Sequence, residues 1–175
     1  FFEMNEVLKA IRERLTCRQY RPEQVKEEDL QQILEAGTWA ASGMGKQSAR
    51  MVVIQDEKLR EKFRRMNAAI QGRDGDPFYG APTIVLVLAD STVHTWVEDG
   101  SLVIGNLMLA AESLGVGSCW IHRAREMFDS DEGKAMLKEW GIPETYRGVG
   151  HCALGYAAAP APAYKPRRED AILRL

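Results

Sequence analysis

Apolar residues recur along this chain with the period of a helix in some stretches and as short continuous runs in others. Helical spacing predicts helices over the ranges 5–15, 26–41, 57–71, 95–114 and 130–140. Short apolar runs with β-branched residues predict strands over the ranges 50–55, 83–89, 118–122 and 149–156. The order is therefore two helices, and then strands that alternate with helices.

For three of these elements the sequence also predicts the environment or the helix cap. The run Thr83–Ala89 has no polar face, which is typical of a strand buried on both sides. The 95–114 helix is apolar around most of its circumference, which favours a place in the core or at an interface. Asp129 and Glu132 have the spacing of a capping box at the start of the 130–140 helix.

The last segment, 157–175, is not expected to form a normal core element because prolines interrupt it. It also carries a basic cluster, Lys165–Arg168, and an apolar end, Ala171–Leu175. We expect it to be extended and exposed unless something docks it. The apolar end suggests docking onto a partner, and an ordinary soluble tail is the alternative.

Composition narrows the class of protein. The chain has 175 residues, a formal net charge of −2 and 45% hydrophobic residues, which fits one domain with a sizeable core. The nearly neutral charge argues against a nucleic-acid binder, which would carry a basic face. Cys17, Cys119 and Cys152 form no C-x-x-C pair, so a reducing, cytoplasmic setting fits best. No apolar run is long enough for a membrane span, and the first residues do not resemble a secretory signal.

A first group of candidate binding residues follows the first predicted helix. Arg14, Thr16 and Arg18 alternate, so in an extended segment their side chains point the same way and can converge on one anion. Arg12 adds a further positive charge nearby. A solvated basic rim at the end of a helix explains the same spacing and stays open.

A second group is the glycine-containing stretch 43–48. It lacks the P-loop pattern and joins a helix to a strand, the reverse of the P-loop order, so we exclude an NTPase. Its glycines allow the backbone to approach a flat ligand, with Ser42 and Gln47 as polar groups. A simple tight turn is the alternative.

The third group lies at the end of the 118–122 strand, where His122 and Arg123 emerge into a loop of the kind that binds ligands. A histidine there can equally be a structural residue. His94, His122 and His151 are too far apart to indicate a metal site, so no metal is expected. The chain also shows no obvious nucleophile, so the basic groups and glycine loops favour a phosphorylated, planar cofactor that supplies the chemistry.

Taken in order, these segments resemble the motifs of the nitroreductase family of FMN-dependent oxidoreductases over nearly the full chain. The family pattern R-R-S-x-R-x-F/Y corresponds to Arg14–Tyr20, and P-S-x-x-N-x-Q-P corresponds to Ala41–Ser48. Further matches are Ala81–Val85, Leu114–Ile121 and Leu154–Tyr156. This chain departs from the pattern at Leu15, Ala41, Gly45 and Ser48, which stand where the family has Arg, Pro, Asn and Pro.

The resemblance implies an α+β fold with a mixed, mostly antiparallel sheet of four to five strands flanked by helices. It also implies an interlocked homodimer with FMN at the interface. Residues 1–156 would form the FMN-binding domain, and residues 157–175 would form a tail that docks on the partner subunit.

The resemblance also assigns roles to residues. Arg14 and Thr16 would bind the FMN phosphate and ribityl chain, with Lys165 or Arg167 completing the phosphate site. Arg18 would approach the N1–C2=O edge of the ring and stabilise the negative charge of the reduced flavin. The ring would also be contacted by Ser42 and Gly43 of the other subunit, by the backbone of Ile121, His122 and Arg123, and by Asn67.

The implied function is an FMN-dependent oxidoreductase that passes hydride from NAD(P)H to the flavin and then reduces a small acceptor such as a nitroaromatic or a quinone. No nucleic acid or membrane partner is expected. Two alternatives stay open: a protein that binds or senses flavin without efficient NAD(P)H turnover, and a specialised flavin-dependent dehalogenase or dehydrogenase.

Overall fold

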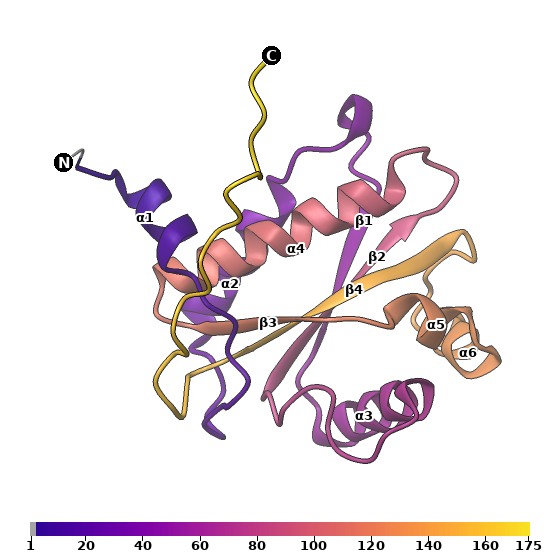
Figure 1. Ribbon diagram of the computed structural model, residues 1–175. Helices are drawn as coiled ribbons and strands as arrows, with labels where there is room; N and C mark the ends of the chain where they lie inside the picture. Colours follow the sequence, from indigo (N-terminus) through magenta and orange to yellow (C-terminus); the bar gives the residue numbers. More distant parts are fainter. Residues whose placement is uncertain (1–2) are drawn as a thin grey trace.

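The computed structural model describes residues 3–175, and a single sheet lies at its centre with helices on both sides (Figure 1). The strands are β1 (Ala49–Ile54), β2 (Thr83–Asp90), β3 (Gly117–Ile121) and β4 (Tyr146–Gly155). The helices are α1 (Glu6–Glu13), α2 (Glu27–Thr38), α3 (Glu57–Gln71), α4 (Trp96–Ser113), α5 (Ala124–Asp129) and α6 (Asp131–Glu139), with a short 3₁₀ turn η1 (Gly43–Gly45).

The sheet has the strand order β1-β2-β4-β3, and all three pairings are antiparallel. Among the described residues, parallel pairing occurs only at an isolated bridge between Thr16 and Ser118. The expected α+β fold with a mostly antiparallel sheet is confirmed. β1 and β3 are the two edge strands, so β3 is free to pair with a further segment of chain.

Two apolar clusters cover the two faces of the sheet. Successive residues of a strand point to opposite faces. Leu86 and Leu88 of β2 pack in the cluster with α3, α5 and α6, whereas Val85 and Val87 pack in the cluster with α2 and α4. β2 is therefore buried on both sides, as its unbroken apolar run predicts.

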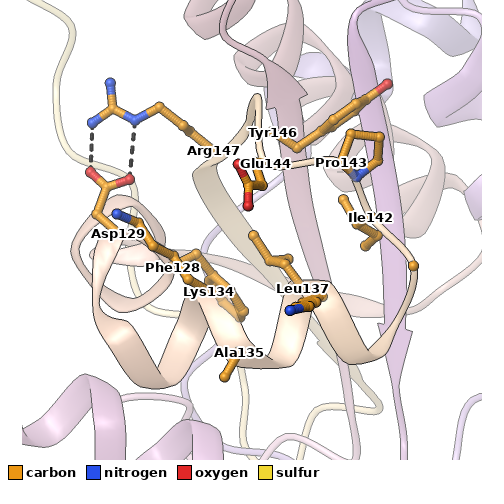
Figure 2. Close-up of a pocket in the computed structure, with 12 residues that line it drawn as sticks. Phe128, Asp129, Lys134, Ala135, Leu137, Ile142, Pro143, Glu144, Tyr146 and Arg147 are labelled. Atoms are coloured by element: carbon orange, nitrogen blue, oxygen red, sulfur yellow. Dashed lines mark hydrogen bonds and ion pairs between the residues drawn. The ribbon is translucent and has the colours of Figure 1, made fainter.

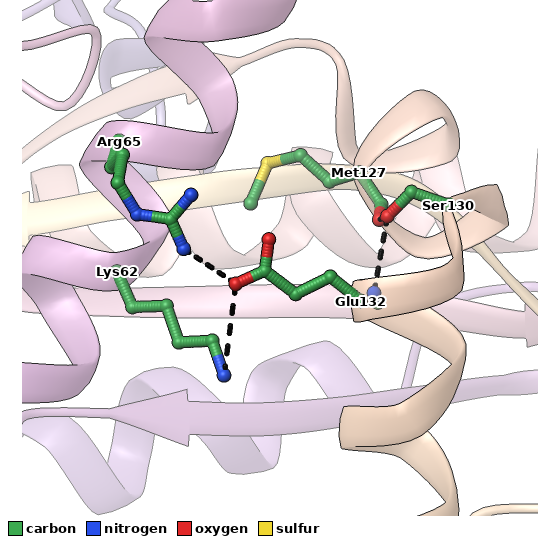
Figure 3. Close-up of polar contacts among 6 residues, drawn as sticks. Lys62, Arg65, Met127, Ser130 and Glu132 are labelled. Atoms are coloured by element: carbon green, nitrogen blue, oxygen red, sulfur yellow. Dashed lines mark hydrogen bonds and ion pairs between the residues drawn. The ribbon is translucent and has the colours of Figure 1, made fainter.

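The expected capping box at the start of α6 is wrong. Ser130 is the N-cap: its hydroxyl accepts a hydrogen bond from the Gly133 amide at 3.1 Å and donates to the Met127 carbonyl (Figure 3). Asp129 instead ends α5 and binds Arg147, while Glu132 binds Arg65 and Lys62 on α3. The additional helix α5, which the apolar pattern did not predict, moves the start of α6 by one residue.

The segment after β4 runs back beside the N-terminal segment without forming a helix or a strand (Figure 1). Tyr20 forms an antiparallel bridge with Ala157, and the Ala158 amide donates to the Gln19 carbonyl at 2.9 Å. From residue 161 onward the tail is exposed, as expected, including the apolar side chains Ile172, Leu173 and Leu175. No helix within residues 3–175 is both long and apolar enough to cross a membrane.

Candidate functional site

The segment after α1 lies along the outer edge of β3. The Cys17 amide donates to the Ser118 carbonyl at 2.9 Å, next to the bridge between Thr16 and Ser118. Gly117 permits this approach, because a Cβ atom at that position would lie 2.8 Å from the Cys17 sulfur. An extended backbone over residues 14–18 therefore follows the edge strand, as the alternating motif predicts.

Positive side chains are spread along this edge from both ends of the chain. Arg14 is half-buried and Arg18 is exposed, with its guanidinium carbon 5.9 Å from the centre of the Tyr79 ring. Burial raises the pKa of the Cys119 thiol, and the charges of Arg18 and Arg14 both oppose that rise. Both charges thus act on the same buried thiol of β3.

The C-terminal tail reaches the other end of this strip. The Tyr164 hydroxyl donates to the Glu13 carbonyl at 3.3 Å, so the tail contacts the residue before Arg14. Arg167 folds back and donates from two nitrogens to the Lys165 carbonyl, at 2.8 and 3.3 Å. Both tail cations are exposed.

These cations have no carboxylate partner within the part of the chain that the structure describes. Over residues 3–175 the ion pairs use the basic residues Lys62, Arg64, Arg65, Arg147 and Arg168. Unpaired positive charge at the Arg14 end favours an anionic ligand, and a phosphate is the group that such guanidinium and ammonium donors bind best.

At the far end of β3 the chain turns sharply through His122 and Arg123. Arg123 has a left-handed backbone, with φ of 73°. The buried Asn67 of α3 donates to the His122 carbonyl at 2.9 Å and accepts from Nε of Arg123 at 2.7 Å. A non-glycine residue in this conformation costs about 1 kcal/mol or more, so the two hydrogen bonds hold a strained turn in place.

His151 of β4 fixes the residue before the turn. Its Nδ1 lies 3.0 Å from the Ile121 carbonyl oxygen, and the side chain is buried against Phe63 and Phe78. Burial lowers the pKa of His151 to about 4, so the ring is neutral at pH 7 and Nδ1 carries the proton that Ile121 accepts. The carbonyls of Ile121 and His122 are thus both bonded to side chains from other elements.

The segment 42–48 lies in a different part of the structure, at the start of α4. The Ser42 hydroxyl accepts a hydrogen bond from the Gln47 amide at 3.0 Å, and the Gly43 amide donates to Asp99 in the first turn of α4. Thr16 lines a cavity together with Glu112, which is near the last turn of that helix. A helix of 18 residues spans about 27 Å. Within one chain the structure therefore does not bring Ser42, Gly43 and Gln47 together with Arg14 and Thr16.

A cavity of 890 Å³ lies away from all of these residues, between α6 and the start of β4 (Figure 2). Leu137 and Ile142 line it together with the pair Asp129–Arg147. The hydrogen bonds from Arg147 hold the pKa of Asp129 below its usual value. No residue of the sequence motifs lines this cavity, so it is not the candidate site.

The chemistry of the groups along β3 is the chemistry that FMN needs. In chain order they are Arg14, the hydroxyl of Thr16 and Arg18, with the His122–Arg123 turn at the end of β3. Guanidinium and hydroxyl groups bind phosphate and sugar-alcohol oxygens. Sequence reasoning did not single out Tyr79 or Asp99.

Comparison with known proteins gives a consistent result. The model of the Nitroreductase family matches residues 11–156. A protein of Archaeoglobus fulgidus described as NADH dehydrogenase/NAD(P)H nitroreductase is 32% identical over 159 residues, which are 87% of this chain and 86% of the relative. A nitroreductase of Bacteroides fragilis with bound FMN superposes with a TM-score of 0.88 at 31% identity and covers 98% of this chain and 100% of its own. An iodotyrosine deiodinase bound to FMN and 3-iodo-L-tyrosine has a TM-score of 0.77 at 27% identity and covers 96% and 97%.

Proposed function

The chain belongs to the nitroreductase family, and from that premise we propose that it is an FMN-dependent oxidoreductase. It passes hydride from NAD(P)H to FMN and then electrons to a small acceptor such as a nitroaromatic or a quinone. The names of its relatives, which include an FMN reductase [NAD(P)H] of Bacillus subtilis, support the nicotinamide co-substrate.

One observation carries this proposal: the basic C-terminal tail contacts the end of α1 through Tyr164 and Glu13, next to Arg14 in the segment that follows the edge of β3. A polypeptide gains nothing in stability from gathering like charges, because they repel one another. A bound phosphate removes that repulsion. The gathering is therefore explained by an anionic ligand.

When bound, FMN supplies the redox chemistry, accepting hydride from the nicotinamide and giving electrons to the acceptor. Arg14, Thr16 and Lys165 would bind its phosphate end, and Arg167 would assist. Arg18 would supply positive charge that stabilises the reduced ring. The Ile121–Arg123 turn would contact the ring through its backbone.

The working unit that we propose is a homodimer. In the single chain the apolar residues Val7, Leu8 and Ile11 of α1 are 66%, 50% and 51% exposed, although they share one helical face. Burying such a face against a second copy, together with the tail 157–175, removes apolar surface from water. The same arrangement lets Ser42 and Gly43 of one protomer reach the flavin of the other.

We assign the protein to a reducing, cytoplasmic setting. All three cysteines are free thiols in the structure. Cys152 is completely buried, and burial raises the pKa of its thiol, so it is inert.

The test uses the purified chain with FMN. We expect it to bind FMN in equal ratio per protomer and to lose its flavin absorbance when NADH or NADPH is added without oxygen. Addition of a nitroaromatic or a quinone then restores the absorbance. A protein that takes up no FMN overturns the proposal. A protein that binds FMN but is not reduced by either nicotinamide is the flavin binder instead.

Reductive dehalogenation is a second candidate, because the deiodinase superposes over nearly the whole chain. The same reduced holoprotein distinguishes the two. Release of iodide from 3-iodo-L-tyrosine, with no faster turnover of nitroaromatics or quinones, assigns the chain to that reaction.

A further inference from the structure

Asp99 is a buried carboxylate that forms no ion pair with any described residue. Its side chain lies in the first turn of α4 and the residue is 2% exposed. A buried carboxylate is costly unless hydrogen bonds replace its water. The groups that donate hydrogen bonds to Asp99 therefore indicate which part of the chain it stabilises.

Both of its oxygens accept hydrogen bonds from the segment 42–48. The Gly43 amide donates to Oδ1 at 2.9 Å, and the Ser48 hydroxyl donates to Oδ2 at 2.6 Å. Burial by itself would raise the pKa of Asp99, but the hydrogen bonds from Ser48 and Gly43, with the nearby Thr95 hydroxyl, outweigh it and the pKa lies below its usual value. Asp99 is thus an ionised anchor at both ends of the segment.

The anchored segment is strained and closely packed. Met44 and Gln47 have left-handed backbones, with φ of 53° and 49°. A Cβ atom at Gly43 would lie 2.1 Å from the Thr95 hydroxyl oxygen, so the backbone sits directly on the start of α4. Strained conformations of this kind persist only where the surroundings impose them. Below the segment is a small cavity of 120 Å³, which Ser42, Gln47 and Asp99 line.

Ser48, which donates to Asp99, is also a position where this chain departs from the family motif. The resemblance expects a proline at this position, and a proline would stiffen the segment through its ring. Ser48 has no such ring, but it is 3% exposed and gives its hydroxyl to Asp99. A side-chain hydrogen bond here provides the rigidity that the backbone of this chain lacks.

We propose that Asp99 is the positioning residue for the flavin-facing segment. It holds Gly43 and Ser48 so that Ser42 and Gly43 of one protomer meet the ring bound by the partner, and so that the acceptor meets a fixed surface above it. This inference rests on the proposed function. Asp99 positions the segment through its two hydrogen bonds, and its negative charge is not required.

The experiment compares holoprotein variants of Asp99. In Asp99→Asn, the side-chain oxygen still accepts from Gly43 and the amide donates to the Ser48 oxygen, so the geometry is kept without the charge. Asp99→Leu removes both bonds, and Ser48→Ala removes one. Glu98→Gln, an exposed residue of the same helical turn, is the control for charge. The readouts are the FMN dissociation constant, acceptor KM and kcat, and thermal unfolding.

We expect Asp99→Asn and Glu98→Gln to keep the FMN dissociation constant and acceptor KM within about 3-fold of the parent. Ser48→Ala should raise both by about 3- to 10-fold, the range of one lost hydrogen bond, with a smaller change in kcat. Asp99→Leu should raise them further. If it does not fold, Ser48→Ala and Asp99→Asn still decide the question.

Two results overturn the inference. One is a Ser48→Ala protein whose FMN affinity and acceptor KM equal those of the parent. The other is an Asp99→Asn protein as damaged as one that has lost both bonds, since that assigns the effect to charge. Failure of the parent chain to bind FMN is a different result, and it overturns the proposed function itself.

Discussion

Asn67 and Arg123 are joined by a hydrogen bond of 2.7 Å that ties the middle of α3 to the turn after β3. The same Asn67 side chain donates to the His122 carbonyl, so one buried amide controls both residues of the turn. The amide therefore acts on the backbone beside the proposed flavin, although its own polar atoms are occupied within the protein.

We expect Asn67→Leu to destabilise the fold by about 1–3 kcal/mol, because it leaves buried partners unsatisfied, and to slow flavin reduction. Asn106→Ala, which removes a hydrogen bond to the Ala36 carbonyl far along α4, is the control that costs stability alone. Adding Arg123→Gly to Asn67→Leu should restore part of the rate, since glycine adopts φ of 73° without strain. Stopped-flow reduction and thermal unfolding measure the two effects. An unchanged reduction rate in Asn67→Leu would limit Asn67 to a structural role.

Arg14→Ala should weaken FMN binding by roughly 10- to 100-fold, the range expected for a lost charge-assisted hydrogen bond to phosphate. Arg12→Ala changes the net charge equally, but Arg12 is exposed on α1 and should keep the parent affinity. Fluorescence titration of FMN compares the two. Equal losses in both variants would indicate a general charge effect and no phosphate contact at Arg14.

Arg18→Ala should raise the barrier to flavin reduction more than it loosens FMN binding. We expect a reduction rate about 10- to 100-fold lower and a more negative flavin potential, because the charge that stabilises the reduced ring is gone. Arg18→Lys keeps the charge and should fall between the alanine variant and the parent. Anaerobic stopped-flow and spectroelectrochemistry measure these quantities, and a potential unaltered by Arg18→Ala would contradict the assignment.

Gly105 tests the homodimer. It lies in the middle of α4 on one helical face with Leu102 and Leu109. Apart from its chain neighbours and the backbone of its own helix, no atom of the described chain lies within 4 Å of where its Cβ would be. Glycine there costs about 1 kcal/mol relative to alanine, and nothing in the single chain requires it. Gly105→Leu should therefore shift the protein toward monomer in light scattering and lower its FMN content. Ala69→Leu, on an exposed position of α3, is the matched control. A Gly105→Leu protein that stays dimeric would exclude this face.

The lowered pKa of His151 predicts that the stability of the fold decreases over a limited range of acidic pH. Its pKa falls from the ordinary 6.5 to about 4 in the folded state, so between these values the unfolded chain binds a proton that the folded chain does not. The free energy of unfolding should fall by about 3 kcal/mol as the pH drops through this window. His151→Leu should flatten that slope, whereas His94→Gln, at an exposed position, should keep it. Urea unfolding at several pH values measures the slope, and an unaltered slope in His151→Leu would assign it to other groups.

The sequence by itself determined the four strands and the longer helices in their order, but not the short helix α5. The unbroken apolar run of β2 required burial on both faces, and the periods of α3 and α4 predicted those helices nearly to their observed ends. The alternation of Arg14, Thr16 and Arg18 likewise indicated an extended cationic segment. These features depend on residues that are close in sequence, and local periodicity reports them directly.

Only the tertiary structure decided which of these segments meet. The contact of Tyr164 with Glu13 spans 151 positions, and the anchor of Ser48 on Asp99 spans 51, so no local pattern contains them. The left-handed turn at Arg123 and the N-cap at Ser130 likewise depend on partners in other elements or on a preceding helix. Such contacts follow from how the sheet and helices pack, because packing pairs distant residues whose spacing carries no periodic signal.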